Sequence, residues 1–244
     1  MHRYRLGRLT LQSMEPAELF QVAEPGLRHV VTVNAEIFVL AHENPAYGAL
    51  QERTCNTIDG RPVQWLAALL NDRPFPRKLS GSDLLEPLAA HCRAGGHRLF
   101  LLGASEQTNT LACRRLRERY PRLHIEGYAP PMTEDVTDPG WNARILATLD
   151  RFHPEYVVTA FGSPKGDFWM DHARAPLEAM GVRFAAGFGG ALKFTAGLKP
   201  RAPRWIQWAG LEWLFRLAVE PRRAWRTVRK FRMPYYALRR RPEP

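Results

Sequence analysis

Five nearly continuous apolar segments recur along the chain, and stretches with helical spacing of hydrophobic residues separate them. Continuous apolar runs rich in Val, Leu, Phe and Ile are typical of strands buried on both faces of a sheet. The expected strands are 28–34, 98–105, 123–129, 155–162 and 182–190. The expected helices are 34–53, 60–70, 82–95, 106–119, 138–152 and 166–180. This alternation predicts an α/β fold with a mostly parallel sheet and helices on both faces.

Polar residues and glycines follow the expected strands. In open α/β sheets, ligands bind outside the carboxyl ends of parallel strands, so we expect these residues to converge on one edge of the sheet. The βα loops also need turn residues for purely structural reasons, which explains some of them equally well. The strand-end residues are Thr32 and Asn34, Gly103, Tyr128 with Pro130 and Pro131, Gly162 to Asp167, and Gly189 with Gly190.

The stretch GSPKG at 162–166 lies where the strand 155–162 ends. A glycine there lets backbone N–H groups approach an anion, and Lys165 adds a positive charge. These features indicate a binding site for a phosphate or diphosphate. The alternative is an ordinary βα turn with a solvated lysine.

Asp59 lies in the stretch NTIDGRPV, directly before Gly60 and an expected helix. A partly desolvated carboxylate at this place could accept a proton from a hydroxyl group. Asn34 could orient a polar substrate through its amide donor and acceptor. The structural alternatives are a turn or helix N-cap at Asp59, and a helix cap formed by Thr32 or Asn34.

Other catalytic and cofactor motifs are missing from the sequence: G-x-S-x-G, HExxH, GxGxxG and GxxxxGK[ST]. The three cysteines at 55, 92 and 113 have no CxxC or zinc-ligand spacing, which is typical of buried thiols in a reducing compartment. No signal peptide and no run of about 18 apolar residues occurs. We therefore expect a cytoplasmic protein, and these motifs give no indication of a metal or a cofactor.

The net charge of +11 is concentrated at the C-terminal end. Residues 198–244 contain thirteen Lys and Arg against three Glu, which leaves +1 for residues 1–197. This break predicts an α/β core over 1–197 and a basic, amphipathic, helical appendage over 198–244. Four Trp and two Tyr among the cations favour an anionic membrane surface as partner. Composition alone also allows a nucleic-acid partner.

The C-terminal stretch 201–226 is the most specific part of the sequence, because RAP-x-W, GLEW and R-L-x-x-EP-x-R have no generic structural reason to occur together. Further motifs are TVN at 32–34, IDG at 58–60, LSGSDL at 79–84, RLFLLGAS at 98–105, LRERYPRLHIEGY at 116–128, GSPK at 162–165 and GFGGALKFTAG at 187–197. With these motifs the chain resembles, along nearly its whole length, the WecG/TagA/CpsF family of bacterial glycosyltransferases.

The resemblance implies an inverting transfer from a UDP-sugar to a polyprenyl-diphosphate-linked saccharide, without an essential metal, on the inner face of the plasma membrane. It implies that Asp59 is the general base and that Thr32 and Asn34 line the substrate pocket. Together with the strand ends, it gives a candidate donor site of Gly103, Tyr128, Gly162, Pro164, Lys165, Gly166, Asp167, Gly190 and Lys193. The implied ligands of the acceptor diphosphate are Lys78, Arg77, Arg216, Arg223 and Arg226. A homo-oligomer is also implied.

The chain departs from the family pattern at three places, two in the candidate donor site and one among the ligands of the acceptor diphosphate. Gly166 and Asp167 stand where the family has Gln-Glu, Lys193 replaces an acidic residue, and Lys78 replaces an arginine for which Arg77 is an alternative. We expect Lys193 to meet an anionic group, either a uronic-acid carboxylate or the donor diphosphate. Alternatively, position 193 no longer contacts the donor, or the chain is a catalytically silent relative that binds or scaffolds in a polysaccharide assembly complex. Nucleic acid is not an expected partner once the resemblance is considered.

Overall fold

The computed structural model describes residues 1–22, 26–200, 202–203, 206, 215 and 229–238. The chain divides into two compact units. Unit 1 consists of Met1–Met14, Val33–Ser80 and Pro200–Pro244. Unit 2 consists of Glu15–Thr32 and Gly81–Lys199. The expected division at residues 197 and 198 stays a prediction.

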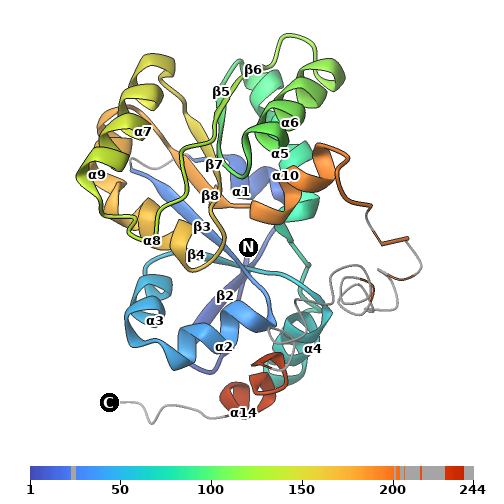
Figure 1. Ribbon diagram of the computed structural model, residues 1–244. Coiled ribbons are helices and arrows are strands. Elements are labelled where there is room, and N and C mark those ends of the chain that lie inside the picture. The colour runs from blue at the N-terminus through green and yellow to red at the C-terminus, as the bar shows by residue number, and fades with distance from the viewer. Residues whose placement is uncertain (23–25, 201, 204–205, 207–214, 216–228, 239–244) are drawn as a thin grey trace. The chain divides into compact units, whose positions relative to one another are not determined.

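Eight strands form one sheet in the order β1-β2-β4-β3-β8-β7-β5-β6 (Figure 1). Their bounds are β1 His2–Leu6, β2 Leu9–Ser13, β3 Arg28–Val33, β4 Cys55–Ile58, β5 Arg98–Gly103, β6 His124–Tyr128, β7 Tyr156–Ala160 and β8 Phe184–Gly187. Strands β1 and β2 pair antiparallel, whereas β2 with β4, β3 with β8, β8 with β7, β7 with β5 and β5 with β6 are parallel. The predicted α/β fold with a mostly parallel sheet is confirmed.

Helices accompany the strands in both units. Unit 1 contains α2 Ala35–Glu43, α3 Pro45–Glu52, α4 Arg61–Leu70 and, near the C-terminus, α14 Met233–Leu238. Unit 2 contains α1 Pro16–Phe20, α5 Gly81–Gly95, α6 Glu106–Arg119, α7 Pro139–Phe152, α8 Lys165–His172, α9 Arg174–Ala179 and α10 Gly189–Thr195. In Figure 1, α7, α8 and α9 cover one face of the strands of unit 2, and α5, α6 and α10 cover the other.

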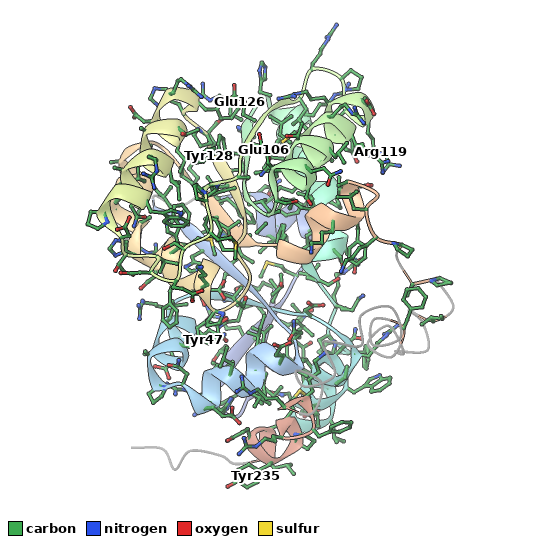
Figure 2. All side chains as sticks on the ribbon, in the orientation of Figure 1. Tyr47, Glu106, Arg119, Glu126, Tyr128 and Tyr235 are labelled. Atoms are coloured by element: carbon green, nitrogen blue, oxygen red, sulfur yellow. The ribbon has the colours of Figure 1, made fainter. Side chains whose placement is uncertain are left out.

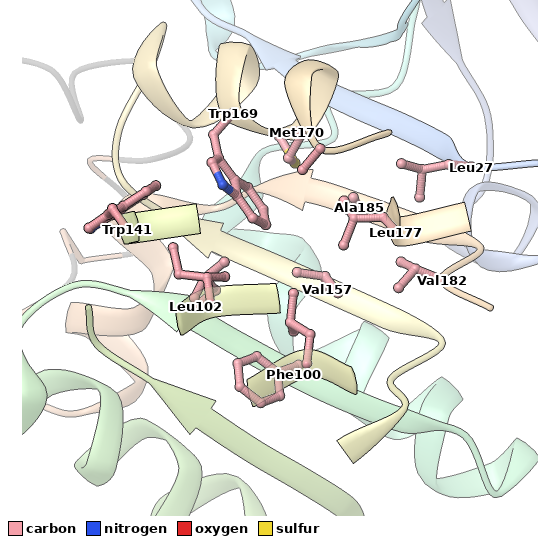
Figure 3. Close-up of a cluster of buried hydrophobic side chains, with 13 residues drawn as sticks. Leu27, Phe100, Leu102, Trp141, Val157, Trp169, Met170, Leu177, Val182 and Ala185 are labelled. Atoms are coloured by element: carbon pink, nitrogen blue, oxygen red, sulfur yellow. The ribbon is translucent and has the colours of Figure 1, made fainter. Parts of the chain in front are cut away.

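The hydrophobic core of unit 2 explains why its strands are apolar throughout. On one face, Phe100 and Leu102 of β5 pack with Trp141 of α7 and with Trp169 and Met170 of α8 (Figure 3). The alternate residues of β5 point to the other face and are equally buried. Burial on both faces requires apolar residues at every position of the strand, which is the pattern that identified these strands in the sequence.

Three strands of the sheet were not predicted from the sequence. In β1 and β2 only alternate residues are buried, so neither strand forms a continuous apolar run. A tight turn joins them, and Gly7 occupies it with φ of +55°. The third, β4, has four residues and contains Asn56 and Thr57. Short strands with polar positions give a weak hydrophobic signal.

Two predicted helices are each broken into two. The expected helix 34–53 divides into α2 and α3 at Asn44, because Pro45 disfavours helical backbone in the residue before it. The side chain of Asn44 then caps α3 by accepting a hydrogen bond of 3.0 Å from the Tyr47 N–H. The expected helix 166–180 divides into α8 and α9 at Ala173. The expected strand 182–190 is also too long, since α10 begins at Gly189.

The cysteines agree with the prediction of unpaired thiols. All three are free, and Cys92 and Cys113 are buried. Burial raises the pKa of the Cys113 thiol to about 11 and raises the pKa of Cys92 still further. Thiols held protonated in this way are poor nucleophiles, so neither is a candidate catalytic group.

A histidine cluster in unit 2 makes the stability of the fold depend on pH. The His91 ring contacts Tyr156, with 3.0 Å between Nε2 and Oη, and lies 5.7 Å from the ring of His97. Burial lowers the pKa of His91, and the nearby His97 and Arg183 side chains lower it further. The folded state therefore resists protonation of His91, whereas the unfolded chain takes up this proton at about pH 6.5.

We expect the free energy of unfolding to fall as the pH drops below about 6.5, because only the unfolded state binds this proton readily. Above pH 7 the contribution of the neutral ring is fully present. The measurement is urea unfolding at pH 7.5 and pH 5.5. A His91→Gln variant should show a smaller loss than the wild type, whereas a His124→Gln control on the exposed edge of β6 should not. Equal losses in all three proteins would exclude His91 as the cause.

The C-terminal helix α14 is present, but its predicted basic amphipathic character concerns residues that lie mostly outside the described part of the chain. Within unit 1, α14 packs against α2. The Glu43 carboxylate of α2 receives ion pairs of 3.3 Å from Arg229 and 2.6 Å from Arg232. The Tyr236 ring lies 5.2 Å from the ring of His42. These contacts fix residues 229–238 on the C-terminal end of α2.

Candidate active site

Unit 2 contains a cavity of about 690 Å³ at the carboxyl ends of its parallel strands. Its lining comes from the segments that follow β5, β6, β7 and β8, so the expected convergence of these strand ends is observed. The lining residues are Gly103, Ala104, Ser105, Glu106, Thr108, Ala129, Pro130, Pro131, Met132, Thr133, Trp141, Ala160, Phe161, Lys165, Gly189, Lys193, Leu198 and Lys199. A cavity of this size can enclose a ligand such as a nucleotide.

The cavity is rich in positive charge. Lys165 begins α8, Lys193 lies in the last turn of α10, and Lys199 follows α10. Glu106 is the acidic residue among the described lining residues. Three ammonium groups against one carboxylate favour an anionic ligand, and Trp141 and Phe161 add aromatic surface for its apolar parts.

The loop after β5 requires glycine at position 103 for two reasons. Its φ is +97°, a conformation that L-residues rarely adopt. In addition, a Cβ at this position would lie 2.8 Å from a ring carbon of Phe161. The Asn109 side chain fixes the loop by donating to the carbonyl oxygen of Gly103 at 2.9 Å. The cavity wall formed by β5 is therefore tightly constrained.

Several lining residues were not predicted from the sequence, and three of them carry a charge or a large ring: Glu106, Trp141 and Lys199. Glu106 is the first residue of α6, whose N-cap Ser105 accepts a hydrogen bond from the Thr108 N–H, and Figure 2 labels it beside the strand ends. Trp141 donates from Nε1 to the carbonyl oxygen of Pro131 at 2.9 Å, which holds the loop after β6. Of the three, only Glu106 carries a sequence signal, namely its place at the helix start after β5.

The predicted donor residues are only partly brought together. Gly103, Lys165 and Lys193 line the cavity, and Gly189, next to the predicted Gly190, does so as well. Gly162, with φ of +81°, and Pro164, which follows a cis peptide bond, form the turn into α8 without belonging to the described lining. Tyr128 packs against the hydrophobic core of unit 2 instead.

Gly166 and Asp167 face the interior of unit 2. A Cβ at position 166 would lie 3.1 Å from Oγ1 of Thr159, so β7 and α8 approach closely there. Asp167 is almost completely buried, and a Cβ on Gly187 would lie 3.2 Å from its Oδ1 atom. These two departures from the family pattern therefore contribute to packing between α8, β7 and β8.

In unit 1, backbone hydrogen bonds bring three predicted site residues close together. The Asp59 N–H donates to the carbonyl oxygen of Val33 at 3.0 Å, which places Asp59 beside Asn34. The Leu79 N–H donates to the carbonyl oxygen of Ile58 at 2.7 Å, which places Lys78 beside the same strand end. Asn34, Asp59 and Lys78 are all partly exposed.

The roles of Asn34 and Asp59 in local structure differ. Asn34 caps α2, because its Oδ1 atom accepts hydrogen bonds of 3.0 Å from Glu36 and 3.1 Å from Ile37. Its Nδ2 donor makes neither of these bonds. At the start of α4 the N-cap is Gly60, with φ of +84°, rather than Asp59. The structural alternative of a helix cap is thus confirmed for Asn34, whereas the N-cap residue that follows Asp59 is Gly60.

The remaining predicted residues are distributed as follows. Thr32 is buried in β3 and belongs to unit 2. The Arg77 N–H donates to Oγ of Ser13 at 2.8 Å. The Arg77 side chain, next to Lys78 in the sequence, is exposed. Arg216, Arg223 and Arg226 lie outside the described residues.

Two further observations on the described residues concern metal binding and membrane crossing. No group of three or more His, Cys, Asp or Glu within them is arranged to hold a metal ion. None of the helices described is both long and apolar enough to cross a bilayer.

Comparison with known proteins identifies the family. Residues 4–243 match the Glycosyl transferase WecG/TagA/CpsF family. A relative from Bacillus subtilis (strain 168), named N-acetylglucosaminyldiphosphoundecaprenol N-acetyl-beta-D-mannosaminyltransferase, is 27% identical over 210 residues, which cover 86% of this chain and 77% of the relative. A relative of the same name from Staphylococcus aureus (strain MRSA252) is 27% identical over 198 residues, covering 80% and 73%. Because the match covers nearly the whole chain, the chain belongs to the WecG/TagA/CpsF family of glycosyl transferases.

Proposed function

We propose that this chain is an inverting glycosyltransferase that moves a sugar from a UDP-sugar to a polyprenyl-diphosphate-linked saccharide in cell-envelope or exopolysaccharide synthesis. The observation that carries the proposal is the cationic cavity at the carboxyl ends of β5 to β8 in a member of this family. The relatives from Bacillus subtilis and Staphylococcus aureus support it, because their names describe sugar transfer to a diphosphoundecaprenol-linked acceptor.

The cavity of unit 2 suits the donor nucleotide. A UDP-sugar carries two negative charges on its diphosphate, and Lys165 and Lys193 supply two positive charges in the lining. Lysine ammonium groups can stabilise the diphosphate as it leaves, a role that needs no metal. Trp141 and Phe161 offer flat apolar surface to the base or the sugar ring.

Asp59 acts as the general base in this proposal. Its carboxylate removes the proton from an acceptor hydroxyl while the hydroxyl oxygen bonds to the anomeric carbon of the donor. The bond between this carbon and the diphosphate oxygen breaks, and UDP leaves with the electron pair. The Nδ2 group of Asn34 is the donor available to orient the substrate, because its Oδ1 already caps α2. Lys78 and Arg77 bind the acceptor diphosphate beside Asp59.

The C-terminal segment is the proposed contact with an anionic membrane surface. Tyr235, labelled in Figure 2, and Leu238 are 59% and 65% exposed on α14. Arg229 and Arg232, which pair with Glu43 of α2, have partly exposed side chains. Exposed aromatic and apolar groups next to cations are typical of proteins that bind at the membrane interface. We propose binding on the inner face of the plasma membrane rather than to nucleic acid, and a homo-oligomer stays a prediction.

Lys193 is the residue of the cavity for which we predict an effect on donor choice. Two unit charges 4 Å apart interact by about 4 kcal/mol at an effective dielectric constant of 20. A Lys193→Asp variant should therefore weaken binding of the present donor strongly and change the order of preference among UDP-sugars. The measurement is the binding constant of each donor by calorimetry. An Arg151→Asp variant, which makes the same charge change on exposed α7, is the control, and an unchanged donor order at position 193 would disprove the assignment.

The proposed function is tested with a panel of UDP-sugars and a lipid-linked acceptor that carries N-acetylglucosamine on its diphosphate. We expect UDP release that depends on the acceptor for at least one donor, and that continues in the presence of EDTA. Binding of a UDP-sugar without release under any condition would instead favour a catalytically silent binding protein. Absence of both binding and release across the panel would contradict the proposal.

A further inference from the structure

Helix α4 of unit 1 exposes two large apolar residues and buries a polar one. Its buried face contains Val63, Gln64 and Ala67, so the polar Gln64 lies inside. Its outward face carries two large apolar residues, Trp65 and Leu69, which are 52% and 78% exposed. A surface helix normally shows polar residues to solvent and apolar residues to the core. Exposed apolar groups gathered on one face indicate a surface that binds another apolar group.

The loop after α4 adds a third apolar group and is held rigidly. Phe75 is 60% exposed in this loop. The residues on both sides of it are fixed, because Gln64 donates to the carbonyl oxygen of Pro76 at 2.7 Å and Tyr4 donates to that of Pro74 at 2.5 Å. The inward position of Gln64 is thereby explained. We call Trp65, Leu69 and Phe75 the α4 strip.

The α4 strip begins next to the proposed acceptor site. The N-cap of α4 is Gly60, directly after Asp59. With a rise of 1.5 Å per residue, Trp65 and Leu69 lie about 8 Å and 14 Å along the helix from Gly60. The loop that carries Phe75 continues into Arg77 and Lys78, and Leu79 pairs with Ile58 beside Asp59. The carboxylate and the cations thus lie at the start of α4, and Trp65 and Leu69 lie further along the helix.

We infer that the α4 strip binds the first isoprene units of the lipid-linked acceptor. This inference rests on the proposed function, and it extends it by assigning a site to the hydrocarbon chain. The acceptor carries its reacting sugar and its diphosphate at one end and its prenyl chain beyond them. In the same way Asp59, Arg77 and Lys78 lie at the start of α4, and the α4 strip extends from there. The cations beside the strip match the diphosphate charge, which distinguishes a prenyl diphosphate from other apolar partners.

The inference is tested by direct binding, without turnover, so that it can succeed or fail independently of the proposed function. The probes are farnesyl diphosphate, which carries a prenyl chain, and inorganic diphosphate, which carries none. In the full-length chain, a Trp65→Ser/Leu69→Ser double variant should bind farnesyl diphosphate about tenfold more weakly, because apolar surface is no longer buried. Binding of inorganic diphosphate should be unchanged.

Two further variants separate the strip from general effects. Trp65→Phe/Leu69→Met keeps apolar side chains and should retain binding of farnesyl diphosphate. Tyr235→Ser/Leu238→Ser removes a similar exposed apolar pair from α14. It should lower binding to vesicles of anionic lipid and leave farnesyl diphosphate binding unchanged. Thermal unfolding of each variant shows that the fold is retained, as expected for substitutions of exposed residues.

Three results would overturn the inference. In the first, the Trp65→Ser/Leu69→Ser variant binds farnesyl diphosphate as tightly as the wild type, or it binds farnesyl diphosphate and inorganic diphosphate more weakly by the same factor. The second is loss of vesicle binding with farnesyl diphosphate binding intact, which would assign the strip to the bilayer. The third is a smaller oligomer in sedimentation with farnesyl diphosphate binding intact, which would assign the strip to a contact between copies of the chain.

Discussion

Replacing Asp59 with Asn is expected to lower the turnover number about 10²–10⁴-fold, because the amide cannot accept the proton of the acceptor hydroxyl. The fold should be unaffected, since Asp59 is held through its backbone N–H to Val33 and Gly60 occupies the N-cap of α4. Donor binding should also be unchanged. The measurement is acceptor-dependent release of UDP, with the binding constant of the donor determined on the same protein.

The control for this variant is Asp150→Asn, the same chemical change on the exposed face of α7. It should turn over at the wild-type rate. Near-normal turnover of Asp59→Asn would remove Asp59 from the role of base. A large loss of thermal stability in Asp59→Asn would show that its side chain supports the fold instead.

Replacing Lys165 with Gln is expected to lower the turnover number about 10²-fold or more, the range found when one charge-stabilising donor is removed from a transition state. Negative charge grows on the departing diphosphate during the reaction, so a lysine at this position acts most strongly at that stage. The Michaelis constant should change much less. Steady-state kinetics with saturating acceptor separates the two constants.

Arg151→Gln, which removes a positive charge elsewhere in unit 2, is the reference for this comparison. It should leave both constants unchanged. If Lys165→Gln raises the Michaelis constant and keeps the turnover number, Lys165 binds the donor equally in the ground state and the transition state. The proposed stabilisation of the leaving diphosphate would then be wrong.

The strands that the sequence predicts correctly are those whose residues are buried on both faces of the sheet. Strands β5 and β7 are apolar throughout because helices cover both of their faces, and each was expected within a few residues of its bounds. Strands β1 and β2 are half exposed, so their polar outward positions hide them. The break between α2 and α3 at Asn44–Pro45 carried a local signal, since an Asn-Pro pair marks turns, but the surrounding apolar periodicity concealed it.

The sequence predicts those residues of the candidate site that directly follow a strand. Gly103 and Lys165 follow directly from the rule that ligands bind at the carboxyl ends of parallel strands, and both line the cavity. Trp141 and Lys199 enter the lining from segments distant in the sequence, so only the tertiary structure reveals them. Asp167 was expected at the donor, yet α8 turns it toward β8, because residues on this face of the helix pack into the core.

Asn34 has a structural role through its Oδ1 atom and a proposed functional role through its Nδ2 atom. Its Oδ1 atom is committed to the start of α2, as an N-cap residue requires. This commitment fixes the orientation of the amide and therefore the direction of its Nδ2 donor. A structural role at the helix start thus positions the polar group that the proposed reaction uses.

A crystal structure of the chain with bound UDP tests most directly whether the cavity of unit 2 is the donor site. We expect the diphosphate oxygens within hydrogen-bond distance of the Nζ atoms of Lys165 and Lys193, with the rest of the nucleotide between the loops that follow β5 and β6. UDP bound elsewhere on the chain, or a cavity that stays empty at saturating UDP, would contradict this assignment.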